Sequence, residues 1–174
     1  MYLKIGDEYA DGEIALLGDL LAMIDKELLR VQAQVEISKD PESDGLLDRG
    51  EYFVGIGFTA IQQYFTDTLT LTGIDKKGAL DVGPQYSSSL SFAQAINAAA
   101  NYWKHSAEWN SETKLRKDAQ RTIDVVSEVA DAHYYPLYNS LYALIRGSDV
   151  TLCSLIPMLV LWRTSVDSLR NGNA

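Results

Sequence analysis

The sequence predicts an all-α fold, a single compact bundle of five or six helices in one domain that spans residues 1–174. Two observations predict it. An alanine-rich run of strong helix formers covers residues 91–109, and its small side chains let other helices approach closely. In the first part of the chain, apolar residues recur at alternating spacings of three and four, as in the buried seam of a packed helix. These residues are Ile14, Leu17, Leu21, Ile24, Leu28, Val31 and Val35.

The first helix is expected over residues 13–37, after a short irregular lead at residues 1–12. Leu16, Leu20 and Met23 widen its apolar stripe beyond a two-stranded seam, which favours the core of a bundle over a free coiled coil. Because the apolar stripe of this helix is wide, we expect the helix to be deeply buried.

A polar, turn-rich segment at residues 38–50 predicts a loop, and a second helix is expected over about 51–72. Gly55 and Gly57 either weaken this helix or mark a close crossing with a neighbour. Glycines and a run of serines then predict a long irregular loop near residues 73–90.

The helix at residues 91–109 is expected at the centre of the molecule, with Ser91 as its N-cap. Phe92, Ile96 and Ala99 form its core stripe, and we expect the whole helix to be deeply buried.

Three further helices are expected in the C-terminal part of the chain. The first follows a break at Asn110 and Ser111, has Leu115 and Ala119 on its buried stripe, and ends near His133. Pro136 suits the first turn of the next helix, which runs to about Arg146 and stops at Gly147. The last helix starts at Asp149, is kinked or restarted at Pro157, and ends at about Arg170.

The formal charge of −9 is concentrated in the N-terminal third. Residues up to Glu51 include 13 acidic and 5 basic side chains, whereas the rest of the chain has 11 acidic and 10 basic ones. This excess works against nonspecific nucleic-acid binding, because phosphate contacts need Lys and Arg. It fits a basic partner surface, mimicry of nucleic acid, or simply a solvated face that keeps the protein soluble.

The sequence has no basic region followed by an apolar leader. Its longest apolar run, residues 155–162, is far shorter than the roughly 20 residues of a membrane-spanning helix. We therefore expect a soluble cytoplasmic protein with no membrane partner.

One set of polar residues could carry chemistry: Asn101, Lys104, His105 and Glu108. Spacings of three and four place an amide, an imidazole and a carboxylate on one helical face, where they could transfer a proton or position a phosphate. The alternative is a surface or hydrogen-bonded structural histidine.

An intracellular helical chain with these residues on one helix loosely resembles the HEPN family of helical-bundle domains, many of which are RNA-cleaving toxins or antiviral factors. The resemblance implies a ribonuclease motif in which an arginine precedes a histidine on one helix at a dimer interface. His105 matches the histidine, but the positions of the arginine are Ala98, Ala99 and Ala100. If the relationship holds, this departure implies an inactive or non-nuclease member.

A second candidate is an interface formed by Tyr134, Tyr138 and Tyr142, which are spaced by four residues. Tyrosines can bury their rings and leave the hydroxyl in water, which suits a subunit interface or a groove as well as a core.

No motif for a metal, a cofactor, a phosphate loop or an acyl-transfer site is found, and Cys153 has no second cysteine to pair with. The sequence therefore predicts a small acidic protein that acts by protein–protein contact, with another protein or with a second copy of itself as a homodimer. The alternative is a HEPN-like RNA-processing enzyme that uses His105, with RNA as its substrate.

Overall fold

The computed structural model describes residues 2–6, 8–70, 72–109, 114–146 and 149–172. Within these ranges the chain forms seven α-helices, one short 3-10 helix and one two-stranded sheet, so the predicted all-α class is confirmed. The expected number of five or six helices is too low, because a short helix lies in a segment predicted to be a loop.

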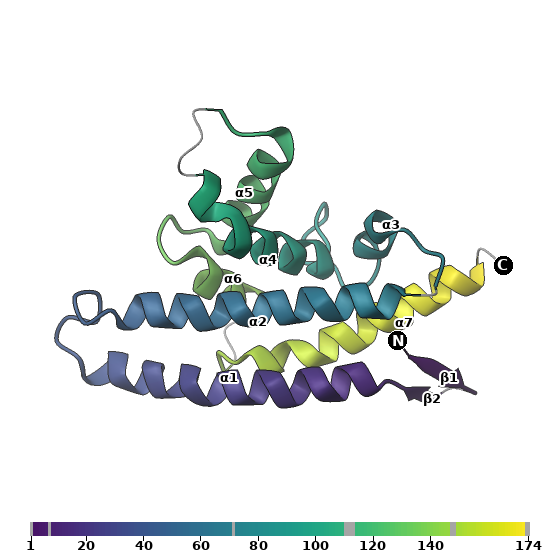
Figure 1. Cartoon of the computed structure of the whole chain (residues 1–174), viewed down its shortest axis with the longest axis horizontal. Coiled ribbons are helices and arrows are strands. Elements are labelled where there is room, and N and C mark those ends of the chain that lie inside the picture. Colours follow the sequence, from purple (N-terminus) through teal and green to yellow (C-terminus); the bar gives the residue numbers. More distant parts are fainter. Residues whose placement is uncertain (1, 7, 71, 110–113, 147–148, 173–174) are drawn as a thin grey trace.

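The two longest helices, α1 (Gly12–Ile37) and α2 (Leu46–Leu69), form an antiparallel hairpin along the length of the molecule (Figure 1). The predicted seam of α1 is buried from Leu17 to Val31, whereas Ile14 and Val35 at its ends are half-buried. Leu16, Leu20 and Met23 are exposed, which corrects the expectation that they widen the buried stripe. The reason is that α1 packs mainly on α2 and on the 3-10 helix, so one of its sides faces solvent.

Two glycines of α2 mark close crossings. A Cβ atom at Gly55 would lie 2.3 Å from the Trp103 ring, and one at Gly57 would lie 2.4 Å from the side chain of Leu152. Gly55 and Gly57 therefore mark close crossings of α2 with its neighbours, which is one of the two roles expected for them.

The helix α4 (Phe92–Trp109) packs against α2, α3, α5, α6 and α7. Ser91 is its N-cap, as predicted, since its hydroxyl accepts the N–H of Gln94 at 3.0 Å and the Gln94 side chain accepts the N–H of Ser91 at 2.8 Å. The buried residues end at Ala100, so the expectation that the whole helix is deeply buried is wrong for its C-terminal half.

Two segments predicted to be irregular contain regular structure. Residues 1–12 include a hairpin of β1 (Leu3–Ile5) and β2 (Glu8–Ala10), with Gly6 in the left-handed region at φ 63°. The hairpin is held by α7, because Lys4 bonds to Asp167 at 2.9 Å. The predicted loop near residues 73–90 contains α3 (Lys76–Asp81), whose buried Leu80 anchors it.

The C-terminal part contains α5 (Lys117–Ala130), α6 (Pro136–Leu144), a 3-10 helix η1 (Leu152–Leu155) and α7 (Ile156–Gly172). The start at Pro136 and the restart beside Pro157 are as predicted. The helix α5 ends before His133, because Asp131 adopts a left-handed conformation at φ 47°. Leu115, expected on the buried stripe of this helix, lies before α5 begins. The cap residue of η1 is Thr151 rather than the expected Asp149. The expected breaks at Asn110, Ser111 and Gly147 lie outside the described residues.

Two acidic residues of the hairpin cap distant helices. The Asp25 carboxylate accepts the N–H groups of Leu152 and Cys153 at 2.6 and 2.9 Å, at the start of η1. The Glu51 carboxylate accepts the N–H groups of Leu137 and Tyr138, both at 2.8 Å, at the start of α6. Helix N-termini favour negative charge, so these carboxylates fix the C-terminal helices on α1 and α2.

The stretch Leu152–Gly172 is the one described segment long and apolar enough to cross a membrane by length and composition. The core helix of a soluble protein passes the same test. Here Trp162 and Val166 are fully enclosed by the other helices, and the neighbouring Arg163 and Asp167 bond to residues of the N-terminal segment. In this apolar stretch, 39% of the window is buried against the rest of the described structure.

Candidate functional site

The outer face of α4 carries a stripe of polar residues that continues past the buried half of the helix. Its members are Gln94, Asn97, Asn101, His105 and Glu108, and they line two neighbouring cavities between α4 and α5. The two cavities share Asp118 and Thr122 of α5, so they form one groove along the α4–α5 boundary.

His105 lies in the second of these cavities, which has a volume of about 430 Å³. Its side chain is 46% exposed, its Nδ1 lies 3.2 Å from Oε2 of Glu108, and its ring stacks on Trp109 at 6.0 Å between centroids. A carboxylate on one ring nitrogen orients the imidazole, as it does for a histidine that acts as a general acid or base. His105 is therefore accessible beside Glu108 and Asn101 rather than sealed in the core.

Lys104 does not belong to this cavity. Its Nζ donates to Oε1 of the buried Gln62 at 2.6 Å, and Gln62 Nε2 donates to Oδ1 of Asn97 and of Asn101 at 2.8 and 2.9 Å. Gln62 thus joins three polar residues of α4 to α2. Sequence analysis missed it, because a single amide within the apolar stripe of α2 gives no local signal.

The three candidate interface tyrosines differ in their exposure, and only Tyr138 and Tyr142 lie on α6, one turn apart. Tyr134 precedes α6 and is exposed, and Tyr142 is exposed on the helix itself. Tyr138 is half-buried against Gly50, and its hydroxyl accepts a bond from Gln32 at 3.0 Å. Tyr138 therefore holds α6 against α1 and α2.

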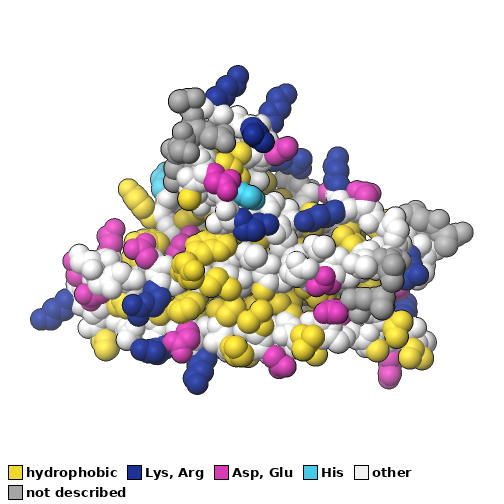
Figure 2. All heavy atoms as spheres, viewed as in Figure 1, with side chains coloured by type: hydrophobic (Ala, Val, Ile, Leu, Met, Phe, Trp, Pro, Cys, Tyr) yellow, Lys and Arg dark blue, Asp and Glu magenta, His cyan; other side chains and the backbone are white. Residues whose placement is uncertain are grey.

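The structure adds a surface that the sequence assigned to the core. Leu16, Leu20 and Met23 lie on the solvent side of α1, and Met23 is 67% exposed. On the face that Figure 2 shows, hydrophobic side chains form a band along the boundary between α1 and α2. Leu16 and Leu20 line a shallow groove of about 180 Å³ together with Ala60 of α2. We call Leu16, Leu20 and Met23 the α1 apolar patch.

Three acidic residues of the N-terminal third serve the fold rather than a partner. Asp25 and Glu51 cap helices, and Asp11 pairs with Arg163 at 2.8 Å. Burial raises the pKa of Glu51, although the bonds from the backbone N–H groups of Leu137 and Tyr138 oppose this shift. The acidic excess available on the surface is therefore smaller than the composition implies.

The single cysteine is a poor nucleophile. Burial, together with the neighbouring Asp25 carboxylate, raises the pKa of the Cys153 thiol to about 12. Because the thiolate is the reactive form, Cys153 is best understood as a packing residue.

Comparison of the chain with protein-family models, with curated proteins and with solved structures gives no match.

Proposed function

We propose that the protein is a non-enzymatic interaction protein, a single helical bundle that docks a partner on the α1 apolar patch. The observation that carries this proposal is the exposure of Leu16, Leu20 and Met23 at helical spacing on one side of α1. Clustered large apolar side chains on a surface are typical of docking sites, because burying them against a partner removes them from water.

The partner that fits this patch is a basic amphipathic helix. Glu13, Asp19 and Glu27 flank the patch along α1, and Lys26 is the cation nearest to Met23 in sequence. An apolar helix face with lysine or arginine at its edges would cover the patch and meet these carboxylates. A second copy of the chain is less suitable, since it would bring two acidic hairpins together.

We expect a fluorescent peptide of leucine and lysine at helical spacing to bind the protein, and Met23→Asp to weaken this binding about tenfold or more. A carboxylate at position 23 would remain unpaired beneath the apolar face of the peptide. Fluorescence anisotropy measures the affinity of the peptide for the protein. This affinity should fall as the salt concentration rises from about 0.05 to 0.5 M, because salt screens the attraction between the basic peptide and the carboxylates beside the patch.

Leu29→Asp is the matched control, because Leu29 is also exposed on α1 but lies about 120° around the helix from Met23. The proposal fails if the peptide does not bind, or if Leu29→Asp weakens binding as much as Met23→Asp. Size-exclusion chromatography is the second readout. A dimer that Met23→Asp dissociates would assign the patch to a second copy instead.

One observation favours a second candidate function, a HEPN-like ribonuclease that acts through His105. Asn101, His105 and Glu108 line one cavity with Arg116, so a polarised imidazole lies in a groove with a cation. Such a groove could hold a phosphate of an RNA chain beside a proton-transfer group. Ala98, Ala99 and Ala100, where the family has its arginine, are buried, so Arg116 would have to supply the positive charge.

Under this second candidate, the wild-type protein cleaves RNA and His105→Ala loses the activity, because no other imidazole lies in the groove among the described residues. His133→Ala is the control, since His133 lies outside both cavities and should retain the wild-type rate. Gel electrophoresis of labelled RNA reports the result, and intact RNA with all three proteins excludes this function.

A further inference from the structure

The larger cavity of the α4–α5 groove lies where α3 faces both helices. It has a volume of about 620 Å³, which is in the range of small-molecule sites. Its walls come from α3, α4 and α5 and from Leu90, which precedes α4, so it exists only in the folded chain. It is distinct from the α1 apolar patch, and the inference below does not depend on the proposed docking function.

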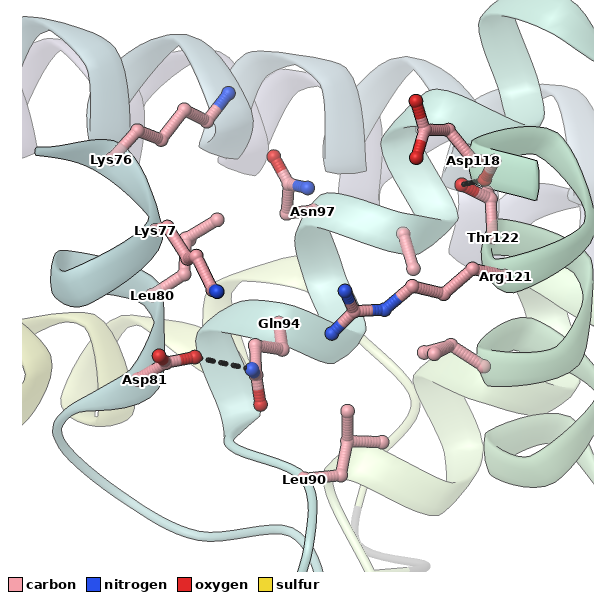
Figure 3. Close-up of a pocket in the computed structure, with 12 residues that line it drawn as sticks. Lys76, Lys77, Leu80, Asp81, Leu90, Gln94, Asn97, Asp118, Arg121 and Thr122 are labelled. Carbon is pink, nitrogen blue, oxygen red and sulfur yellow. Dashed lines mark hydrogen bonds between the residues drawn. The ribbon is translucent and has the colours of Figure 1, made fainter. Parts of the chain in front are cut away.

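The cavity concentrates positive charge on an acidic protein. Lys77 of α3 and Arg121 of α5 reach into it from opposite walls, and Lys76 lies at its rim (Figure 3). In the part of the chain that the structure describes, no carboxylate lies within 4.0 Å of the charged groups of these three residues. Burial, and to a lesser extent the nearby charge of Lys104, lowers the pKa of Lys76.

The two carboxylates of the cavity lie at its edges. Asp81 accepts a bond from Gln94 Nε2 at 2.6 Å, and its carboxylate faces this amide (Figure 3). Asp118 lies beside Thr122 on the far wall. In the described residues neither carboxylate forms an ion pair with Lys77 or Arg121, whose charged groups extend into the cavity from opposite sides (Figure 3).

Amide groups add neutral donors beside the cations. Oδ1 of Asn97 accepts a bond from Gln62, and its Nδ2 lies on the other side of the amide, toward α5 (Figure 3). The remaining wall is apolar and consists of Leu80, Leu90, Ala98 and Val125. The cavity therefore has a cationic, hydrogen-bonding end and an apolar surface.

We propose that this cavity binds a small organic phosphate of mononucleotide size. Arg121 and Lys77 hold the phosphate from two sides, since a guanidinium matches phosphate oxygens in a bidentate manner and an ammonium adds a point charge. Asn97 donates to a polar group of the ligand, and Leu80, Leu90 and Val125 cover its apolar body. A second phosphate would lie toward Lys76 at the rim.

Isothermal titration calorimetry with three probes tests this inference: adenosine 5′-diphosphate, inorganic phosphate and adenosine. We expect the diphosphate to bind most tightly, inorganic phosphate more weakly, and adenosine not measurably at millimolar concentration. Arg121→Gln should weaken binding of the diphosphate about tenfold or more, because a charged hydrogen-bond donor is lost. Circular dichroism confirms that this exposed substitution leaves the fold unchanged.

Lys117→Gln is the matched control, because it removes one positive charge from α5 outside the cavity and should change the affinity less than about twofold. The inference is overturned if no phosphate probe binds, if Arg121→Gln binds like the wild type, or if Lys117→Gln weakens binding equally. Equal affinity for inorganic phosphate and the diphosphate overturns the assignment of an organic ligand. Binding of an RNA oligonucleotide that needs Arg121, without binding of the diphosphate, assigns the groove to a polynucleotide instead.

Discussion

Trp162→Ala is expected to lower the free energy of unfolding by about 3–5 kcal/mol. The Trp162 side chain is fully buried, and its ring centroid lies 4.5 Å from that of Phe65 and 6.1 Å from that of Tyr64. Its indole Nε1 donates to the carbonyl oxygen of Ala79 at 2.7 Å, which fastens α3 to α7. Truncation leaves a cavity that these neighbours cannot fill and leaves one buried carbonyl without its donor.

Urea unfolding followed by circular dichroism measures this loss, and Trp162→Phe separates its two components. Phenylalanine keeps most of the ring packing but cannot donate to Ala79, so we expect a loss of about 1–3 kcal/mol, well below that of the alanine variant. Equal losses for Trp162→Phe and Trp162→Ala would show that the hydrogen bond, rather than the packing, dominates. A loss below 1 kcal/mol for Trp162→Ala would contradict the central place of this residue in the core.

The sequence predicted the helices that have a long local signal. The seam from Leu17 to Val31 repeats over four turns, and Ser91 and Pro136 are local start signals. Each of these features is contained within one element. The structure therefore agrees with the prediction there, apart from shifts of a few residues at the helix ends.

The elements that sequence analysis missed are short and depend on distant residues. The strands β1 and β2 have three residues each, too few for a periodic pattern, and their anchor is Asp167 in the last helix. Asp25 caps a helix that is 127 positions away in the chain, and no rule for local capping can identify such a pair. The partners of Asp11 and Glu51 are also distant in the chain. The sequence therefore does not show which carboxylates of the N-terminal third are structural and which lie on the surface.

The candidate site was predicted in part. His105, Glu108 and Asn101 were placed on one face of a helix, and the structure places them in one cavity. Lys104 precedes His105 by one residue and so points about 100° away, where it meets Gln62. The cations Lys77 and Arg121 come from two other helices, and only the tertiary structure brings them to the same cavity. The exposed Leu16 and Met23 were misassigned because an apolar pattern does not reveal how many neighbours a helix has.

Asp11→Ala is expected to destabilise the protein by about 3–5 kcal/mol, because it leaves a buried arginine without its counter-charge. Asp11 Oδ2 accepts bonds from Arg163 and from the hydroxyl of Tyr64, both at 2.8 Å, and the two charged side chains are 3% and 7% exposed. Asp11 Oδ1 also accepts the N–H of Ile14 at 3.1 Å and so caps α1. Burial and the Asp11 carboxylate raise the pKa of Tyr64, so this hydroxyl remains a donor throughout the physiological range.

The double variant Asp11→Ala/Arg163→Met tests whether the unpaired charge causes this loss. Since methionine removes the stranded guanidinium, the double variant should be more stable than Asp11→Ala alone, although it still lacks the cap, which is worth about 1 kcal/mol. Glu27→Ala is the control, because it breaks the exposed pair with Arg30 and should cost less than about 1 kcal/mol. Urea unfolding ranks the variants. If Asp11→Ala costs no more than Glu27→Ala, the contact between the start of α1 and α7 is dispensable, and packing around Trp162 alone holds the last helix in place.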